Sequence, residues 1–221
     1  MFAAYSNGSD NSFIKVPKGN YGVLIGGVEI TSKNYQNINS TNFPAVKSGK
    51  VTYDPIKRIL TLDNTTIEAT GKEVPIIYQL ESVTATLTIV LRNTNKLSSE
   101  EYSGIATEEA SLYITGGGFL SIDVNPESVG IGTGENLIIE GGCTIKTNGQ
   151  INVFNQLTIN KANIYIKSGK DTPALVGYKG ITLKNCEVVF PKKFTLEYWN
   201  DYYYTFAKKD KTCKEIKIIA N

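Results

Sequence analysis

Histidine is absent from the 221-residue sequence, and methionine and tryptophan occur once each. Without histidine, the chain lacks the commonest general base and the commonest transition-metal ligand. The three cysteines, Cys143, Cys186 and Cys213, are odd in number and form no C-x-x-C pair, so they predict neither a disulfide framework nor a structural zinc site. We interpret them as small buried apolar residues.

Long apolar runs and an excess of one charge are also missing. No apolar run approaches the ~20 residues that a transmembrane helix requires, so we expect no transmembrane segment. The 23 basic and 21 acidic residues leave a net charge of +2, which is too small for a nucleic-acid-binding protein. The first residues lack the charged and apolar regions of a signal peptide, so export would imply that a signal has been removed.

The residues that are abundant favour strands and turns. The sequence has 25 Ile, 14 Val and 22 Thr against 11 Ala, together with 20 Gly and 20 Asn. Because β-branched residues favour strands, and Gly and Asn favour turns, this composition predicts an all-β fold and excludes a helical bundle. A chain of 221 residues is long enough to bury a large core without disulfides.

A repeat of roughly 25 residues organises the middle of the chain. Each copy has an apolar-x-apolar start, a corner rich in Gly or Asn, and a second apolar segment. Six copies begin at Leu60, Leu87, Leu112, Leu137, Leu157 and Ile181. A third short apolar segment follows five of them, at residues 76–78, 104–106, 129–131, 151–153 and 174–176. Three short strands per repeat predict the coil of a parallel β-helix.

When the copies are stacked, equivalent corner residues lie above one another, so each corner position has a predicted orientation or backbone conformation. One position carries only small residues and is expected to face inward: Thr65, Gly118, Cys143, Ala162 and Cys186. The position before it is expected to adopt a positive φ, which Gly and Asn tolerate best: Asn64, Gly117, Gly142, Lys161 and Asn185. Lys161 is the exception to this residue preference.

We therefore predict an all-β, single-stranded parallel β-helix of about six rungs over residues 60–190. Residues 1–20 are expected to be a flexible lead-in to a single domain spanning 21–221. Residues 21–59 form an N-terminal β-hairpin cap, with turns at Gly26-Gly27 and Asp54-Pro55. Residues 191–221 form an aromatic C-terminal cap that ends in an alternating strand over 215–219, because terminal rungs need covering.

These features carry a family resemblance. The hairpin YGVLIGGVEIT at 21–31, the VTYDP at 51–55 that leads into LTLDNTTI at 60–67, and the repeated L-x-I-x-G-G corners resemble a group of uncharacterised bacterial proteins of Bacteroidetes and Firmicutes. These are right-handed parallel β-helix proteins, loosely described as carbohydrate-binding. The resemblance covers residues 20–220 and implies a right-handed solenoid that is exported or attached to the cell surface. It implies no catalytic residues.

Enzymes of pectate-lyase-like architecture share this predicted fold, so we aligned the outward positions of the copies to look for acids. The first strands give the rows Thr61, Thr88, Tyr113, Ile138, Thr158, Thr182 and Asp63, Val90, Thr115, Glu140, Asn160, Lys184. The second strands give the row Glu68, Ser98, Ser121, Lys146, Tyr165, Val189. No row brings two carboxyls within the roughly 5–9.5 Å that glycoside hydrolysis needs. We expect no catalytic residue, metal site or cofactor.

Aromatic residues concentrate near the C-terminus, where seven of the 22 lie within residues 194–206. Exposed flat rings can stack on sugar faces, so the candidate ligand-binding residues are Tyr198, Trp199, Tyr202 and Tyr204. The alternative is that this segment plugs the last rung. Strand alternation places Tyr203 on one face and its two tyrosine neighbours on the other, without saying which face is inward.

The predicted function is a non-catalytic, secreted or cell-surface β-solenoid that binds a polysaccharide or host glycan, or serves in adhesion or as a structural spacer. The first alternative is a polysaccharide lyase or glycoside hydrolase of pectate-lyase-like architecture. A second alternative is a structural element that assembles through its end rungs. Nucleic acid is not an expected partner, and the sequence leaves ligand identity and oligomeric state open.

Overall fold

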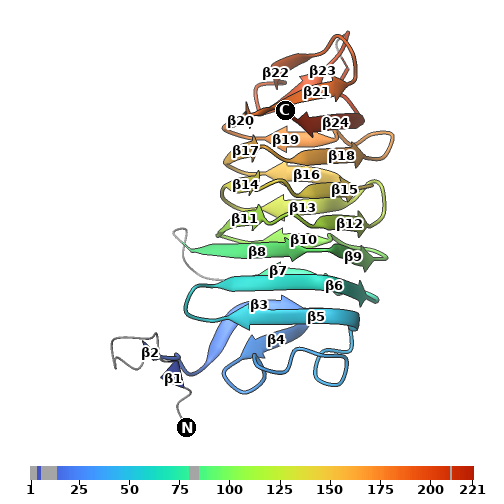
Figure 1. Cartoon of the computed structure of the whole chain (residues 1–221). Coiled ribbons are helices and arrows are strands. Elements are labelled where there is room, and N and C mark those ends of the chain that lie inside the picture. The colour runs from blue at the N-terminus through green and yellow to red at the C-terminus, as the bar shows by residue number, and fades with distance from the viewer. Residues whose placement is uncertain (1–3, 6–13, 80–84, 210) are drawn as a thin grey trace.

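Alternating apolar and polar residues produce strands throughout the chain. The computed structural model describes residues 4–5, 14–79, 85–209 and 211–221, and the regular elements in these ranges are all β-strands. The strands wind into a solenoid whose turns stack from the N-terminal to the C-terminal end (Figure 1). The predicted all-β, parallel β-helix fold is confirmed. The described residues include no helix suited to crossing a membrane.

The strands of successive turns form three stacks, and each turn of the coil passes through all three. The first stack contains β6 (Ile59–Ala69), β8 (Thr86–Arg92), β11 (Ser111–Thr115), β14 (Leu137–Glu140), β17 (Gln156–Asn160) and β20 (Gly180–Lys184). The second contains the end of β6 with β9 (Thr94–Ser99), β12 (Phe119–Asp123), β15 (Thr144–Thr147) and β18 (Asn163–Lys167). The third contains β7 (Ile76–Tyr78), β10 (Ile105–Thr107), β13 (Val129–Thr133), β16 (Gln150–Val153) and β19 (Leu175–Gly177).

The described strands complete five turns, and β20 begins a sixth. The sixth turn is not completed, because β21 (Cys186–Phe190) does not stack on β18. Instead β24 (Glu215–Ala220) lies between β18 and β21 and pairs with both in antiparallel fashion. The chain thus closes the second stack with its own C-terminal strand, where the sequence predicts a sixth parallel rung.

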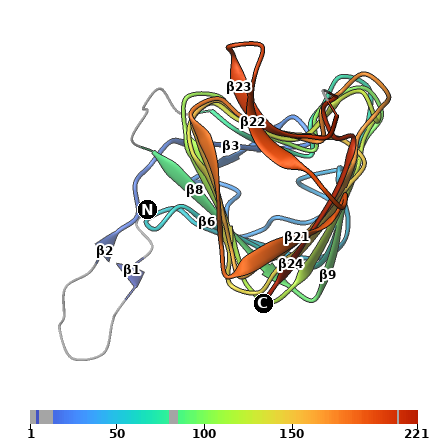
Figure 2. The ribbon, with the colours of Figure 1, turned by 90° about the horizontal axis from the view of Figure 1, so that it is seen from above.

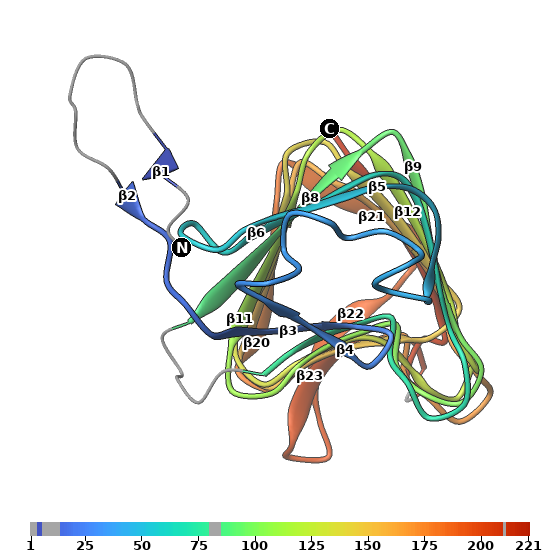
Figure 3. The same ribbon diagram turned by 90° about the horizontal axis from the view of Figure 1, so that it is seen from below.

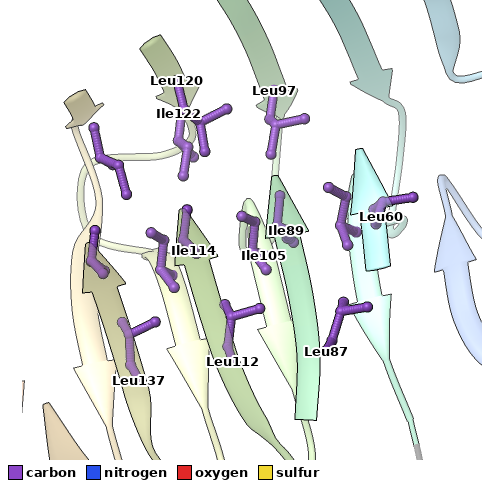
Figure 4. Close-up of a cluster of buried hydrophobic side chains, with 14 of the residues drawn as sticks. Leu60, Leu87, Ile89, Leu97, Ile105, Leu112, Ile114, Leu120, Ile122 and Leu137 are labelled. Atoms are coloured by element: carbon purple, nitrogen blue, oxygen red, sulfur yellow. The ribbon is translucent and has the colours of Figure 1, made fainter. Parts of the chain in front are cut away.

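The interior of the coil is a set of apolar ladders. Leu87, Leu112 and Leu137 are register partners on successive turns, as Figure 4 shows, and each is at most 1% exposed. Full burial of one such side chain stabilises the fold by about 1.5–3 kcal/mol. Because the same ladder position recurs on every turn, the strand alternation fixes which side chains face the core.

Two of the predicted alignments between turns are wrong by two residues. Leu60 pairs with Ile89 instead of Leu87, and Leu97 pairs with Ile122 instead of Leu120. A shift of two residues keeps every side chain on its predicted face, so apolar alternation alone does not distinguish the two registers.

The outward rows change accordingly. Asp63 leaves its predicted row, because it pairs with Arg92. On the second stack one outward row runs Glu68, Ser98, Asp123 and another runs Thr66, Lys96, Ser121, Lys146, Tyr165. Val189 of the predicted row lies where the pairing of β21 with β24 is irregular.

The corners match most of the predicted positions. Asn64, Gly142, Lys161 and Asn185 have φ values of 51°, 82°, 49° and 50°. At the third corner the positive φ falls on Gly116 instead of the predicted Gly117, since Gly116 passes directly over the backbone of Leu91 and leaves no space for a Cβ atom. Among the predicted small inward residues, those of the complete turns are buried, whereas Cys186 is half-exposed because it lies beyond the last complete turn.

Two antiparallel hairpins close the N-terminal end, as predicted. β3 (Asn20–Ile25) and β4 (Val28–Thr31) meet at the Gly26-Gly27 turn, and β3 pairs with β7. β5 (Val46–Asp54) pairs with β6. Figure 3 shows these strands across the open end of the coil. Most of the predicted lead-in 1–20 lies outside the described residues, and its described parts include the paired strands β1 (Ala4–Tyr5) and β2 (Ile14–Lys15).

The hairpin of β22 (Thr195–Trp199) and β23 (Tyr203–Ala207) lies at the C-terminal end. It joins the third stack through the pairing of Gly177 with Tyr204. Figure 2 shows the hairpin reaching beyond the outline of the coils. The predicted C-terminal cap is therefore a hairpin that is attached by its base and exposed at its tip.

Candidate functional site

The β22–β23 hairpin divides the predicted aromatic site between two faces. Tyr198 is paired with Tyr204, and Trp199 with Tyr203. Because side chains alternate along a strand, the first pair and the second pair lie on opposite faces of the hairpin. The structure therefore does not bring the four predicted residues onto one surface.

The face that carries Tyr198 and Tyr204 belongs to the cap. Their ring centroids are 5.0 Å apart, and Tyr204 packs against the hydrophobic core. On the same face Phe206 is 2% exposed and meets Phe194 edge to face at 5.2 Å. Tyr204 is thus a packing residue of the cap, which is the alternative that the sequence left open for this candidate. The ring of Tyr198 covers this cluster and is 52% exposed.

Tyr202 lies at the tip of the hairpin and is 70% exposed. Its neighbours Asn200 and Asp201 have positive φ values of 49° and 60°, which turn the chain sharply between the strands. The hydroxyl of Tyr198 donates a 3.0 Å hydrogen bond to the carbonyl of Asp201 and ties the turn to β22.

The other face of the hairpin continues an aromatic row that the sequence analysis missed. The ring of Phe154 stacks on Tyr178 with 4.8 Å between centroids and 7° between planes. Tyr178 in turn lies 5.9 Å from Tyr203, the cross-strand partner of Trp199. Phe154 is 58% exposed, while the other rings of this row are half-buried. Burial and then the neighbouring Tyr178 raise the pKa of Tyr203, so its hydroxyl stays protonated.

The sequence contains a pattern from which the stacking of Phe154 on Tyr178 could have been predicted. Phe154 and Tyr178 each follow directly after a third-stack strand, and the last residues of those strands, Val153 and Gly177, are register partners. The two aromatic side chains therefore occupy equivalent corner positions on neighbouring turns, about 4.8 Å apart along the axis. We call Phe154, Tyr178, Tyr203 and Trp199 the aromatic row.

A shallow groove of about 420 Å³ lies beside Phe154. Its floor is formed by the small outward residues of the third stack, Ala106 and Gly132, together with Asn152, which are register partners on successive turns. Glu108 borders it as well. The Asn152 side-chain oxygen is buried and has no hydrogen-bond partner among the described residues, so it faces the sheet and not the groove's open side. The groove thus combines an aromatic wall with polar groups, as ligand sites often do.

A second groove, of about 520 Å³, brings together acids that the predicted rows kept apart. Glu68 and Asp123 line it, each a register partner of Ser98, and Glu100 lies at its edge. The two partners of Ser98 are two strand spacings apart, about 9.6 Å. Asp123 accepts a 2.8 Å hydrogen bond from the side chain of Asn148. The expectation that the second-strand row holds a single acid is therefore wrong, because it depended on the shifted register.

The Glu140 carboxylate is held in a separate hydrogen-bonded ladder. It accepts hydrogen bonds from the hydroxyl of Tyr113 and, at 3.2 Å, from the amide of Asn160, which accepts one of 2.9 Å from Asn185. The bond from Tyr113, followed by that from Asn160, lowers the pKa of Glu140. This ladder joins neighbouring turns and leaves Glu140 with a structural role.

The remaining reactive groups do not form a site. Among the described residues no group of three or more Cys, Asp and Glu side chains could hold a metal ion. The three cysteines are free, and burial raises the pKa of Cys143 to about 12, so this thiol stays protonated and unreactive.

No protein-family model, curated protein or solved structure matches this chain. The resemblance to bacterial β-helix proteins therefore stays a prediction.

Proposed function

We propose that the protein is a non-catalytic β-solenoid module that binds a glycan along the aromatic row. The observation that carries this proposal is the parallel stack of Phe154 on Tyr178, continued by Tyr203 on the hairpin. The exposed part of the Phe154 ring offers flat apolar contact area to a sugar face, and its half-buried neighbours hold it in place, so the entropic cost of binding stays low.

The groove beside Phe154 supports the same proposal. Small residues on its floor let a sugar ring approach the sheet, and the side chain of Glu108 provides a polar contact for hydroxyl groups. A glycan bound here would lie partly on the aromatic row and partly on the third stack. The proposed setting is the cell surface or the extracellular space, as the family resemblance implies, and cell fractionation of the native host tests it.

A glycan array followed by calorimetry tests the binding proposal. The intact protein is expected to bind at least one neutral glycan, and Phe154→Ala is expected to weaken that binding about tenfold or more. Phe190, which is 45% exposed and lies on β21 in the other sheet, provides a matched control through Phe190→Ala. Absence of any glycan ligand would leave adhesion or a spacer role as the better account.

A second candidate function is glycoside hydrolysis in the acidic groove. It is favoured by the placement of Glu68 and Asp123 on strands about 9.6 Å apart, just above the roughly 6.5–9.5 Å that separates the carboxyls of inverting enzymes. Incubation with pectins, alginates and host glycans tests it. New reducing ends that disappear in Glu68→Gln and in Asp123→Asn would establish hydrolysis, and the absence of products would exclude it for those substrates.

A further inference from the structure

A row of lysines runs along the outer face of the second stack, on another side of the coil from the aromatic row. Lys96, Lys146 and Lys217 lie in one register line, with Ser121 and Tyr165 on the strands between them. Consecutive members of the line lie on neighbouring strands, so the lysines are two strand spacings apart, about 9.6 Å. We call these three lysines with Tyr165 the lysine row.

The charges of the lysine row are available to a partner. All three lysines are exposed. Within the described part of the chain, neither Lys96 nor Lys146 pairs with a carboxylate. The ammonium group of Lys217 lies 5.1 Å from the centroid of the Tyr165 ring, a cation–π contact that does not neutralise its charge.

The C-terminal end of the row is hollowed into a groove of about 370 Å³. Tyr165 and Phe190 line it, and Phe190 is 45% exposed and pairs with Lys217 across the β21–β24 ladder. The charged side chains of the groove are three lysines, which are Lys146, Lys167 and Lys217, and one acid, Glu215. These four side chains together carry a net charge of +2, which equals the net charge of the whole chain. Positive charge is therefore concentrated at this groove.

We propose that the lysine row binds a linear anionic polysaccharide that runs parallel to the solenoid axis. Positive charges at regular intervals complement carboxylate or sulfate groups that recur along a sugar chain, and Tyr165 and Phe190 contact its sugar rings. A nucleic acid fits this surface less well. Its phosphates follow one another at about 3.4 Å per strand, whereas the lysines are about 9.6 Å apart.

Acidic side chains beside the lysine row favour a partner that is only one polymer chain wide. Glu68 and Asp123 lie in the adjacent outward row, and Glu215 borders the groove. A broad polyanion such as a duplex would meet all three carboxylates, whereas a single sugar chain along the lysine row would meet Glu215 alone. The proposal is independent of glycan binding at the aromatic row, because the two surfaces share no residue.

Affinity electrophoresis of the intact protein tests the proposal. Native gels contain dextran sulfate or polygalacturonate, with uncharged dextran as the control. We expect both anionic polymers, but not dextran, to retard the protein, with the effect decreasing at high salt. Retardation by neither polymer at low salt would overturn the proposal.

Matched variants separate the lysine row from net charge. The triple variant Lys96→Ser, Lys146→Ser, Lys217→Ser is compared with Lys33→Ser, Lys57→Ser, Lys72→Ser, which removes three exposed lysines elsewhere. The first is expected to weaken binding about tenfold or more, and the second less than about threefold. Equal weakening, or tighter binding to a single-stranded oligonucleotide than to either polymer, would contradict the proposal. Phe154→Ala is expected to leave retardation by the anionic polymers unchanged. A failure of polyanion binding at the lysine row can therefore be told apart from a failure of glycan binding at the aromatic row.

Discussion

Tyr204 packs against Tyr198 across the β22–β23 hairpin, with 5.0 Å between ring centroids and 45° between ring planes. Tyr204 also contacts the core, whereas Tyr202, two residues earlier, is 70% exposed at the hairpin tip. Two tyrosines from one short sequence run thus have different roles, one in the cap and one at the surface.

These environments predict different effects of truncation. Tyr202→Ala is expected to change the free energy of unfolding by less than about 0.5 kcal/mol, as is usual for exposed positions. Tyr204→Ala is expected to lower it by about 1–3 kcal/mol, because it removes a packed, half-buried ring. Urea unfolding followed by circular dichroism measures both values. Equal effects would mean that the hairpin does not cap the last turn.

The interior of the coil consists of stacked apolar side chains, so we expect a charge placed inside it to unfold the protein. Ile145 is fully buried, and it pairs with Leu120 and Ile164 on the neighbouring turns. Ile145→Asp is expected to cost several kcal/mol, because an unpaired carboxylate would be placed in an apolar interior. The next residue along the strand, Lys146, is exposed, so Lys146→Asp is the matched control for fold stability. A soluble Ile145→Asp variant with unchanged melting would contradict the assigned register.

The corner at Lys161 predicts a stabilising substitution. Lys161 has a φ of 49°, in the left-handed region that Asn tolerates better than Lys. The equivalent corners at Asn64 and Asn185 use asparagine with nearly the same φ. Lys161→Asn is therefore expected to raise the free energy of unfolding by about 0.5–1 kcal/mol. Lys167→Asn, in the regular strand β18, is the control and is expected to give no gain.

The hydrogen bonds to Glu140 predict a pH dependence of stability. They lower its pKa below the ordinary value of 4.5, so the folded state favours the ionised form. This contribution is present above pH 4.5 and is lost as the pH falls through the lowered pKa of the folded state. Glu140→Gln is expected to be less stable than the wild type at pH 7, with the difference shrinking below pH 4.5. A difference that is constant from pH 7 to pH 3 would contradict this assignment.

The sequence predicts the solenoid because alternation and corner chemistry recur on every turn, and these local features determine which side chains face inward. Register is less well determined. Leu60 pairs with Ile89 because β8 carries a third inward apolar residue, Leu91, before its corner. Aligning the corner residues Asn64 and Asn93, both with positive φ, gives the observed register, whereas aligning the first apolar residue of each copy does not.

The surfaces depend on contacts that a one-dimensional pattern does not contain. The insertion of β24 between β18 and β21 adds Lys217 to the lysine row, and no local signal places a C-terminal strand there. The aromatic row joins two turn corners to a hairpin from the end of the chain. The predicted cluster at residues 194–206 is real as a sequence feature, but its strands divide it between a face with Tyr198 and Tyr204 and a face with Trp199 and Tyr203.

Fluorescence of Trp199 tests the glycan-binding proposal most directly. It is the only tryptophan of the chain and the cross-strand partner of Tyr203 in the aromatic row. The wild type, the double variant Phe154→Ala, Tyr178→Ala and the control Phe190→Ala are titrated with a soluble β-glucan, xylan and galactomannan. We expect a saturable change in emission with at least one polymer, abolished in the double variant and kept in the control. No change with any polymer, or equal loss in both variants, would contradict binding at this surface.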